Sequence, residues 1–178
     1  MTSRFVYGED DRLIAWTETR IAGGKFREDA RAIGHEKDGE LVAVVVYDTF
    51  STTGCFVHLA SGARKWMSRE FAVVAMTYPF IQCGMARISS MVSARNFLSL
   101  RFTRQFGWVE EGVIRCAGND GEDIILFGML RSECRWLPPP AIWRPAPIPS
   151  ISEQSTPAHD VRASSREHAH GQISGQVS

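Results

Sequence analysis

His58 lies within the short apolar segment 55–60 of this 178-residue chain, and its imidazole could move a proton near neutral pH. It is therefore a candidate general base, acting directly or through a water molecule. A lone histidine in a strand is more often a structural hydrogen-bonding residue, and that interpretation stays open beside the catalytic one. Glu70 is a weaker candidate for the same role, since its position is typical of a solvated helix face.

A polar and basic loop follows the histidine segment and could bind an anion. Arg64, Lys65 and Arg69 lie close to Ser68, which can cap a helix that begins at the next residue. The free N–H groups and the dipole at a helix N-terminus attract negative groups such as phosphate. The alternative is a solvated basic turn with an ordinary serine cap.

Metal, disulfide and nucleic-acid chemistry find little support in the composition. The four cysteines, at positions 55, 83, 116 and 134, form no C-x-x-C pair, which argues against a disulfide scaffold and a zinc site. Lys and Arg number 20, as do Asp and Glu, so the formal net charge is zero. Nucleic-acid binding would rest only on the basic loop and on arginines 87, 95, 101 and 104, and we do not expect it.

The two ends of the chain differ in character. The N-terminus has no apolar signal core, and runs such as 41–47 are too short to cross a bilayer, so we expect a cytoplasmic protein with no membrane partner. Seven of the eight prolines lie between 138 and 157, followed by mainly Ser, Gln, His, Gly and charged residues. We therefore expect a folded domain over 1–137 and a Pro-rich, then polar, disordered tail over 138–178.

Strand and helix patterns alternate along the expected domain and must position the residues above. Strand patterns cover 4–7, 31–36, 40–50, 55–60, 87–92, 108–116 and 123–130, and helical spacing covers 12–21, 69–83 and 97–105. Asp-Gly pairs at 38–39 and 120–121 predict hairpins, and the strand-helix-strand crossover over 55–92 predicts a parallel pair. The patterns indicate an α/β fold with a mixed sheet and helices on both faces.

Two details of the helices can also be predicted. Asp10 or Asp11 is a suitable N-cap for the first helix. Pro79 lacks a backbone donor, so we expect it to kink or tighten the last turn of the second helix.

The segment from Asn96 to Arg115, NFLSLRFTRQFGWVEEGVIR, resembles the C-terminal signature of the GCN5-related N-acetyltransferases. In that family an asparagine opens a helix, a small residue (here Ser99) follows three positions later, and a Gly-aromatic step leads into a strand that often reads Glu-Gly. Each feature alone also suits an ordinary capped helix, so the joint spacing carries the resemblance. It covers about 1–137, and its specific part is 87–130.

Within the family, the chain most resembles the ribosomal-protein N-terminal acetyltransferases and their phage and prophage relatives. The segment 128–137, GMLRSECRWL, also resembles the phage-type members. It implies the acyl-CoA N-acyltransferase fold, a mostly antiparallel sheet of six to seven strands in which the parallel strands at 55–60 and 87–92 splay apart. If the chain is phage-encoded, the cytoplasm is that of the host. Whether the chain forms a homodimer stays open.

The resemblance also implies direct transfer of an acetyl group from acetyl-CoA to a primary amine of a protein or small molecule, the acceptor being unknown. The alternative is a weakly active or inactive binding or regulatory module with the same fold. Arg64, Lys65, Ser68 and Arg69 would hold the cofactor pyrophosphate, although this loop lacks the glycines of the family's Arg/Gln-x-x-Gly-x-Gly/Ala pattern. Asn96 would hydrogen-bond the pantetheine arm.

The remaining roles that the resemblance implies lie at the reacting thioester. The backbone N–H of Leu59 would polarise its carbonyl and stabilise the oxyanion, with His58 as base. Thr103 stands where many members have a tyrosine that protonates the thiolate. A threonine hydroxyl is much less acidic than a phenol, whose pKa is about 10, so Thr103 could only position a water molecule. Arg101 and Arg104 could reach phosphates, or could simply be solvated.

Overall fold

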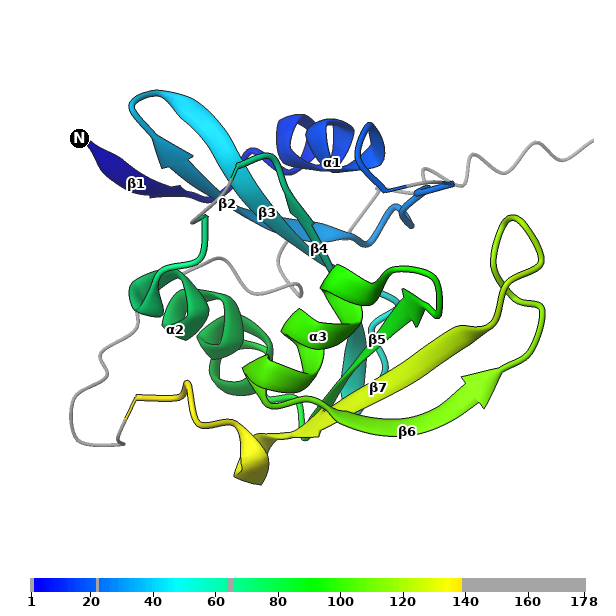
Figure 1. The fold of residues 1–178 in the computed structure, drawn as a ribbon. Helices are drawn as coiled ribbons and strands as arrows, with labels where there is room; N and C mark the ends of the chain where they lie inside the picture. The colour runs from blue at the N-terminus through cyan, green and yellow to red at the C-terminus, as the bar shows by residue number, and fades with distance from the viewer. Residues whose placement is uncertain (1, 22, 64–65, 139–178) are drawn as a thin grey trace, which may run out of the picture. The chain divides into compact units, whose positions relative to one another are not determined.

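The computed structural model describes residues 2–21, 23–63 and 66–138, which form one mixed sheet with helices on both faces (Figure 1). In chain order the elements are β1 (Ser3–Val6), α1 (Asp10–Glu18), β2 (Arg31–Lys37), β3 (Glu40–Asp48), β4 (Gly54–Ser61), α2 (Arg69–Thr77), a π-helical turn (Tyr78–Gln82), β5 (Arg87–Ser93), α3 (Phe97–Phe106), β6 (Val109–Ile114), β7 (Ile124–Leu130) and a 3-10 turn (Arg131–Glu133). This order of strands and helices confirms the prediction from the sequence. None of the helices in these ranges has the length and apolar content that a membrane span requires.

The seven strands lie in the order β1-β2-β3-β4-β5-β7-β6. Every neighbouring pair is antiparallel except β4 and β5, which are parallel and joined by the crossover through α2. The hairpin turn between β2 and β3 has positive φ angles at Asp38 and Gly39, as an Asp-Gly hairpin requires. The expected sheet of mostly antiparallel strands with one central parallel pair is confirmed.

The parallel pair is joined over only part of its length. Pairing between β4 and β5 runs from Gly54↔Arg87 to Phe56↔Ser89, three residue pairs in all. Beyond that point β4 stays with β3 as far as Ser61, while β5 stays with β7 as far as Ser93. The two strands therefore diverge, and the sheet opens into a V at its centre, as the resemblance implied.

Alternate residues of β3 build the two layers of the core. Ala43, Val45 and Tyr47 pack in one cluster with α2, whereas Val44 and Val46 pack in another with Leu13 of α1. This alternation follows from the period of two along a strand, and it explains why the segment is apolar on both faces. β3 thus lies between α1 on one face and α2 on the other.

Helix α1 begins with a different cap from the one we expected. The N-cap is Glu9, and Asp10 and Asp11 are the first two helical residues. The Asp10 side chain is used elsewhere, since its Oδ1 accepts a hydrogen bond from the backbone N–H of Ala32, 2.8 Å away. This carboxylate fixes α1 to the start of β2 instead of closing its own helix.

Pro79 widens the end of the second helix, where we had expected a kink or a tighter turn. The backbone N–H of Cys83 donates to the carbonyl of Tyr78, five residues earlier, which is the pattern of a π-helical turn. Pro79 has no N–H to offer the carbonyl of Ala75, four residues before it. That buried oxygen instead accepts a hydrogen bond from the Tyr47 hydroxyl at 2.8 Å.

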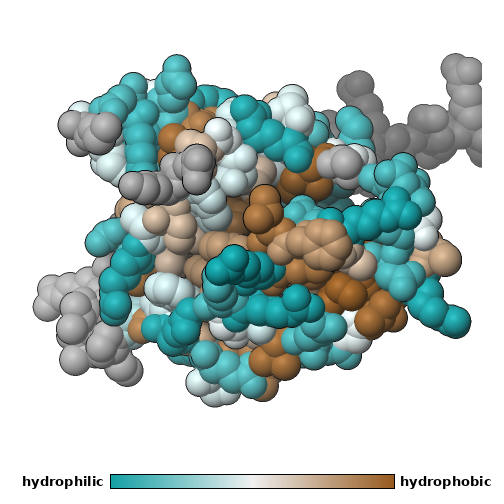
Figure 2. Space-filling view, viewed as in Figure 1, coloured by the Kyte–Doolittle hydropathy of each residue, from teal (hydrophilic) through white to brown (hydrophobic). Residues whose placement is uncertain are grey.

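Several large apolar side chains remain exposed at the far end of the sheet. Phe97 and Leu98, the first two residues of α3, are 75% and 84% exposed, and Val113 and Ile114 of the edge strand β6 are also open to solvent. Figure 2 shows apolar residues mixed with polar ones on this side of the molecule. A bulge between Glu110 and Gly112 interrupts the pairing of β6 with β7.

Candidate functional site

A cleft of about 560 Å³ occupies the V between β4 and β5. Its walls come from five places: residues 58–61 of β4, residues 90–93 of β5, Arg20 and Ile21 after α1, the residues Asn96, Ser99 and Phe102 in and before α3, and the loop between β6 and β7. The cleft therefore brings His58, Leu59 and Asn96 together, which the sequence predicted. It is the place where the sheet leaves strand edges unpaired.

The backbone of β4 points alternately toward β3 and toward β5, and two hydrogen bonds fix the phase. The N–H of Gly62 donates to the carbonyl of Val42 in β3 at 3.0 Å, and the carbonyl of Thr53 accepts from the N–H of Arg87 in β5 at 3.1 Å. Even-numbered residues of β4, like Gly62, therefore direct their backbone groups toward β3, and odd-numbered residues, like Thr53, direct theirs toward β5. The N–H of Leu59 is thus directed toward β5. Since β5 has diverged there, this N–H enters the cleft and is available to a ligand oxygen.

His58 lies in the cleft wall and also has a buried carboxylate partner. Its Nε2 is 2.9 Å from Oδ1 of Asp48, the last residue of β3, and the two side chains are 23% and 8% exposed. The edge of the imidazole contacts the ring of Phe26, with centroids 5.2 Å apart. The hydrogen-bonded and the catalytic interpretations of His58 are thus compatible, because one ring nitrogen is held while the ring borders the cleft.

The Asp48–His58 pair was missed by sequence reasoning, although the strand register could have indicated it. Val46 lies directly opposite His58 in the β3–β4 ladder and packs on the α1 side. A strand alternates with period two, so Asp48 lies on the same face as Val46 and diagonally next to the histidine. Both polar side chains therefore lie on the α1 face of the sheet, and His58 also lines the cleft.

Asn96 caps α3, as predicted. Its Oδ1 accepts a hydrogen bond from the backbone N–H of Ser99 at 3.0 Å, and its side chain is exposed at the cleft. The capping bond uses the oxygen and leaves the amide N–H groups as donors toward the cleft. Gly107 ends the helix with φ of 114°, which a residue with a Cβ would adopt only under strain.

The predicted pyrophosphate residues are described only in part. Ser68 is the N-cap of α2, where its Oγ accepts a hydrogen bond from the N–H of Phe71 at 3.1 Å, and Arg69 is exposed in the first turn. Arg64 and Lys65 lie outside the described residues. Hydrogen bonding to its own backbone N–H, and then to Ser68, lowers the pKa of Glu70, which makes this exposed side chain a poor base.

Thr103 lies deeper than its expected role at the thioester would suggest. It is buried in α3, and the residues of that helix that line the cleft are Ser99 and Phe102. Arg101 and Arg104 are exposed, and Arg104 forms an ion pair with Glu110 at 2.8 Å. Thr103 is thus placed by packing, and its part in the chemistry stays a prediction.

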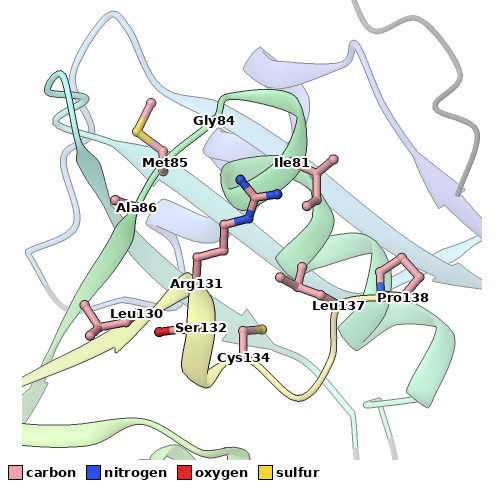
Figure 3. A pocket seen from close by; sticks show the side chains of 10 residues that line it. All are labelled: Ile81, Gly84, Met85, Ala86, Leu130, Arg131, Ser132, Cys134, Leu137 and Pro138. Carbon is pink, nitrogen blue, oxygen red and sulfur yellow. The ribbon is translucent and has the colours of Figure 1, made fainter. Parts of the chain in front are cut away.

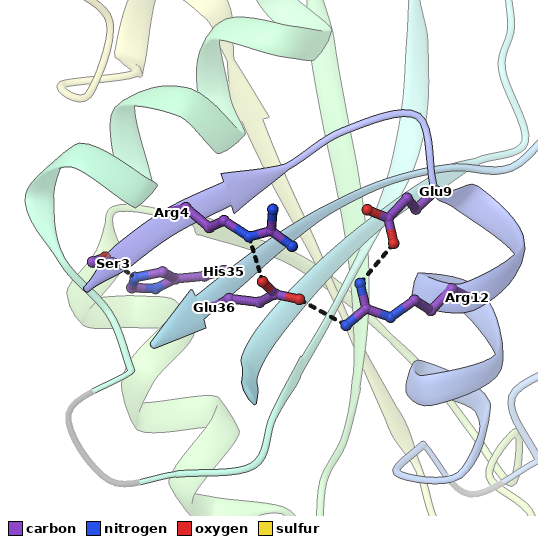
Figure 4. Close-up of polar contacts among 6 residues, drawn as sticks. All are labelled: Ser3, Arg4, Glu9, Arg12, His35 and Glu36. Atoms are coloured by element: carbon purple, nitrogen blue, oxygen red, sulfur yellow. Dashed lines mark hydrogen bonds and ion pairs between the residues drawn. The ribbon is translucent and has the colours of Figure 1, made fainter. Parts of the chain in front are cut away.

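Two buried polar residues of β2 were not singled out from the sequence (Figure 4). Glu36 is 2% exposed and is paired with Arg4 at 2.5 Å and with Arg12 at 2.7 Å, and these bonds lower the pKa of its carboxyl. His35 is fully buried, with Nε2 2.9 Å from the Ser3 hydroxyl. Both side chains join β2 to neighbouring elements, and neither lines the cleft.

A second and larger hollow, of about 990 Å³, lies at the other end of β5 (Figure 3). Its walls are mainly aliphatic, with Ile81, Met85, Leu130 and Leu137 contributing side chains. Burial raises the pKa of the Cys134 thiol in its wall, and the described lining residues include no histidine or carboxylate. The cleft in the V is therefore the candidate active site.

No protein-family model and no curated protein sequence matches the chain. Solved structures do. A spermidine/spermine N-acetyltransferase SpeG from Vibrio cholerae, crystallised with manganese ions, is 14% identical with a TM-score of 0.62, and the match covers 73% of this chain and 93% of that one. A spermidine N-acetyltransferase chimera of Vibrio cholerae SpeG and hSSAT is 15% identical with a TM-score of 0.62, and the match covers 74% of this chain and 98% of that one.

A structure described as a probable acetyltransferase is 17% identical with a TM-score of 0.53, covering 60% of this chain and 63% of that one. At these identities the likeness concerns the fold. The chain has the acyl-CoA N-acyltransferase fold of the GCN5-related enzymes, which confirms the fold that the resemblance implied. The finer placement beside ribosomal-protein and phage acetyltransferases stays a prediction.

Proposed function

We propose that the protein is an N-acetyltransferase that moves an acetyl group from acetyl-CoA directly to a primary amine. One observation carries the proposal: the sheet of an acyltransferase fold opens between β4 and β5, and His58 and Leu59 line the opening. The exposed strand edges offer N–H and C=O groups to an amide-bearing arm. Asn96 would add a side-chain donor to that arm.

The chemistry needs a proton acceptor and an oxyanion donor. The acceptor amine attacks the thioester carbon, the N–C bond forms and the C–S bond breaks, with CoA leaving as the thiolate. The N–H of Leu59 would stabilise the oxyanion of the tetrahedral intermediate. His58 would take the proton that the attacking nitrogen loses, directly or through water, and pass it through solvent to the thiolate.

The acceptor is open within the class of primary amines. An α-amine has a pKa of about 7.7–8.0, whereas a lysine side chain has one of about 10.4, so an α-amine needs less help to react near neutral pH. Two of the structural neighbours are named as spermidine or spermidine/spermine N-acetyltransferases, and polyamines therefore belong in the acceptor panel beside N-terminal peptides. We expect the reaction to take place in the cytoplasm.

The alternative is an inactive module with the same fold, and the glycine-poor loop and Thr103 favour that alternative. Binding of acetyl-CoA distinguishes the two. We expect titration calorimetry to give heat, and thermal unfolding to shift upward, at millimolar acetyl-CoA, because a ligand of the folded state stabilises it. Release of free CoA with one amine of the panel then identifies the acceptor class. Absence of both heat and thermal shift removes the enzyme assignment.

A further inference from the structure

The end of β3 supplies a buried carboxylate to the histidine in the cleft wall, and the proposed chemistry has not yet used it. Asp48 and His58 are 2.9 Å apart across neighbouring strands. We infer that Asp48 is a positioning residue that fixes the ring and tautomer of His58, so that Nδ1 is the proton acceptor. This inference rests on the proposed function.

The tautomer follows from the chemistry of the pair. An ionised carboxylate can only accept a hydrogen bond, so the proton between the two groups must be on Nε2 of His58. A neutral imidazole then carries its lone pair on Nδ1. Among the contacts of the described residues no hydrogen bond to this nitrogen is present, and the ring borders the cleft.

The surroundings hold the pair in place. The Phe26 ring meets the imidazole edge-on at an interplanar angle of 73°, which restricts rotation of the ring. Directly after Asp48, Thr49 has a φ of 51°, a strained conformation for a β-branched residue. Ser51 steadies the same turn, since its Oγ accepts from the N–H of Gly54 at 3.1 Å. Strain that persists at a turn beside a cleft is consistent with a functional constraint.

The other charged side chains that line the described cleft, Arg20 and Glu122, have partners other than His58. Arg20 donates to the carbonyl of Trp16 at 3.0 Å and lies over that indole, 3.7 Å from its centroid. Glu122 accepts from the N–H of Asp120 at 3.0 Å. Asp48 is therefore the carboxylate that the structure assigns to the imidazole.

The pair gives the proton a defined route. When the amine nitrogen bonds to the thioester carbon, its proton moves to Nδ1, and the ring becomes an imidazolium. The negative charge of Asp48, held on Nε2–H, stabilises this cation, and the ring returns to neutral when the proton passes to solvent and the thiolate. An aspartate with this role does not itself take up the proton.

The first test needs no substrate. We expect ¹⁵N spectra of the wild-type chain, with the histidines assigned, to show His58 mainly as the Nε2–H tautomer, and Asp48→Ala to give a mixture of tautomers. A wild-type His58 that carries its proton on Nδ1 would overturn the inference. This readout is independent of whether any amine is acetylated.

The second test is a double-mutant cycle on turnover. We expect Asp48→Asn to lower kcat about tenfold and His58→Gln about a hundredfold, within the usual range for a general base, with little change in KM for acetyl-CoA. Because Asp48 acts through His58, the double variant should be no slower than His58→Gln alone. Glu110→Gln, which breaks the exposed pair with Arg104, is the matched control and should keep full activity.

Additive losses in the cycle, or Asp48→Asn at the wild-type rate while His58→Gln is slow, would refute the role of Asp48 and leave the acetyltransferase proposal intact. A wild-type chain that neither binds acetyl-CoA nor releases CoA refutes the proposed function instead. If the asparagine variant unfolds, the wild-type tautomer still decides the inference.

Discussion

Nδ1 of His35 lies 2.9 Å from the carbonyl oxygen of Trp66, so a fully buried residue of β2 holds the segment that leads into α2. Nδ1 must carry the proton to donate to a carbonyl, and Nε2 then accepts from the Ser3 hydroxyl. Burial lowers the pKa of His35 below its ordinary value of 6.5.

This lowered pKa predicts a loss of stability in mild acid. As the pH falls below 6.5, His35 becomes protonated in the unfolded chain but not yet in the folded chain. The free energy of unfolding therefore decreases with falling pH until the pH reaches the pKa of His35 in the folded protein. Urea unfolding at a series of pH values should show this decline in the wild type and a shallower one in His35→Leu. Tyr7→Phe is the control and should keep the decline, because it removes no group that titrates in mild acid. Equal slopes in the wild type and His35→Leu would contradict the prediction.

Tyr47→Phe should destabilise the fold by about 1–3 kcal/mol, because it removes the hydroxyl that donates to the buried carbonyl of Ala75. Pro79 has no N–H with which to replace the lost bond. Thermal or urea unfolding measures the loss. Tyr7→Phe, at a half-exposed tyrosine, should change the free energy of unfolding by less than about 0.5 kcal/mol.

Asn96 has two separable tasks, and two substitutions tell them apart. Asn96→Ala should cost about 1 kcal/mol through the lost cap and should also weaken acetyl-CoA binding. Asn96→Asp keeps a capping oxygen but removes the amide donors, so stability should be retained while affinity falls. Calorimetry and unfolding together check both. Wild-type affinity in both variants would remove Asn96 from the site.

The amide of Leu59 should report on the bound thioester. Addition of acetyl-CoA should shift its ¹H resonance downfield, since the N–H would gain an acceptor in the cleft. The N–H of Ala60 points toward β3 by the same alternation and is the internal control. If Ala60 moves as much as Leu59, or neither moves while binding is seen, the oxyanion role of Leu59 is wrong.

We propose that the folded domain ends near Leu137, where the Pro-rich composition begins. The Nε1–H of Trp136 donates to the carbonyl of Phe106 at 2.9 Å, so the chain is still fixed there. Removing 139–178 should leave the melting temperature within about a degree or two of the wild type, as expected where few contacts cross. Ending the chain at Cys134, which removes Trp136, should lower it clearly. A large drop for the longer truncation would place the boundary elsewhere.

The order of elements and the divergence of β4 from β5 were accessible from the sequence because they depend on local patterns and on one motif. The apolar run of β3 predicted a central strand, the Asp38-Gly39 turn predicted its hairpin, and the spacing from Asn96 to Gly107 predicted α3 with both ends. Each of these signals is written within a few residues of the chain.

The features that were missed depend on partners far away in sequence. The Asp10 carboxylate accepts a hydrogen bond from the backbone N–H of Ala32 and does not cap its own helix. The hydroxyl of Tyr47, on β3, donates to the carbonyl of Ala75 before the widened turn. Asp48 could be matched to His58 only once the register of β3 and β4 was known. Cross-strand partners of this kind are set by packing, which single-sequence periodicity does not encode.

The three residue pairs that join β4 to β5 also set how the protein would discriminate among thioesters. Past Phe56 the peptide groups of β4 and β5 that face each other no longer pair, and a thioester donor that carries its own amides could bind between them as a short extra strand. A simple acetyl thioester without amides would have to strip the same groups of solvent and leave them unbonded. If the proposed function holds, selectivity for the amide-bearing part of the thioester donor would thus come from main-chain hydrogen bonds and would not depend on side-chain contacts with the acyl group.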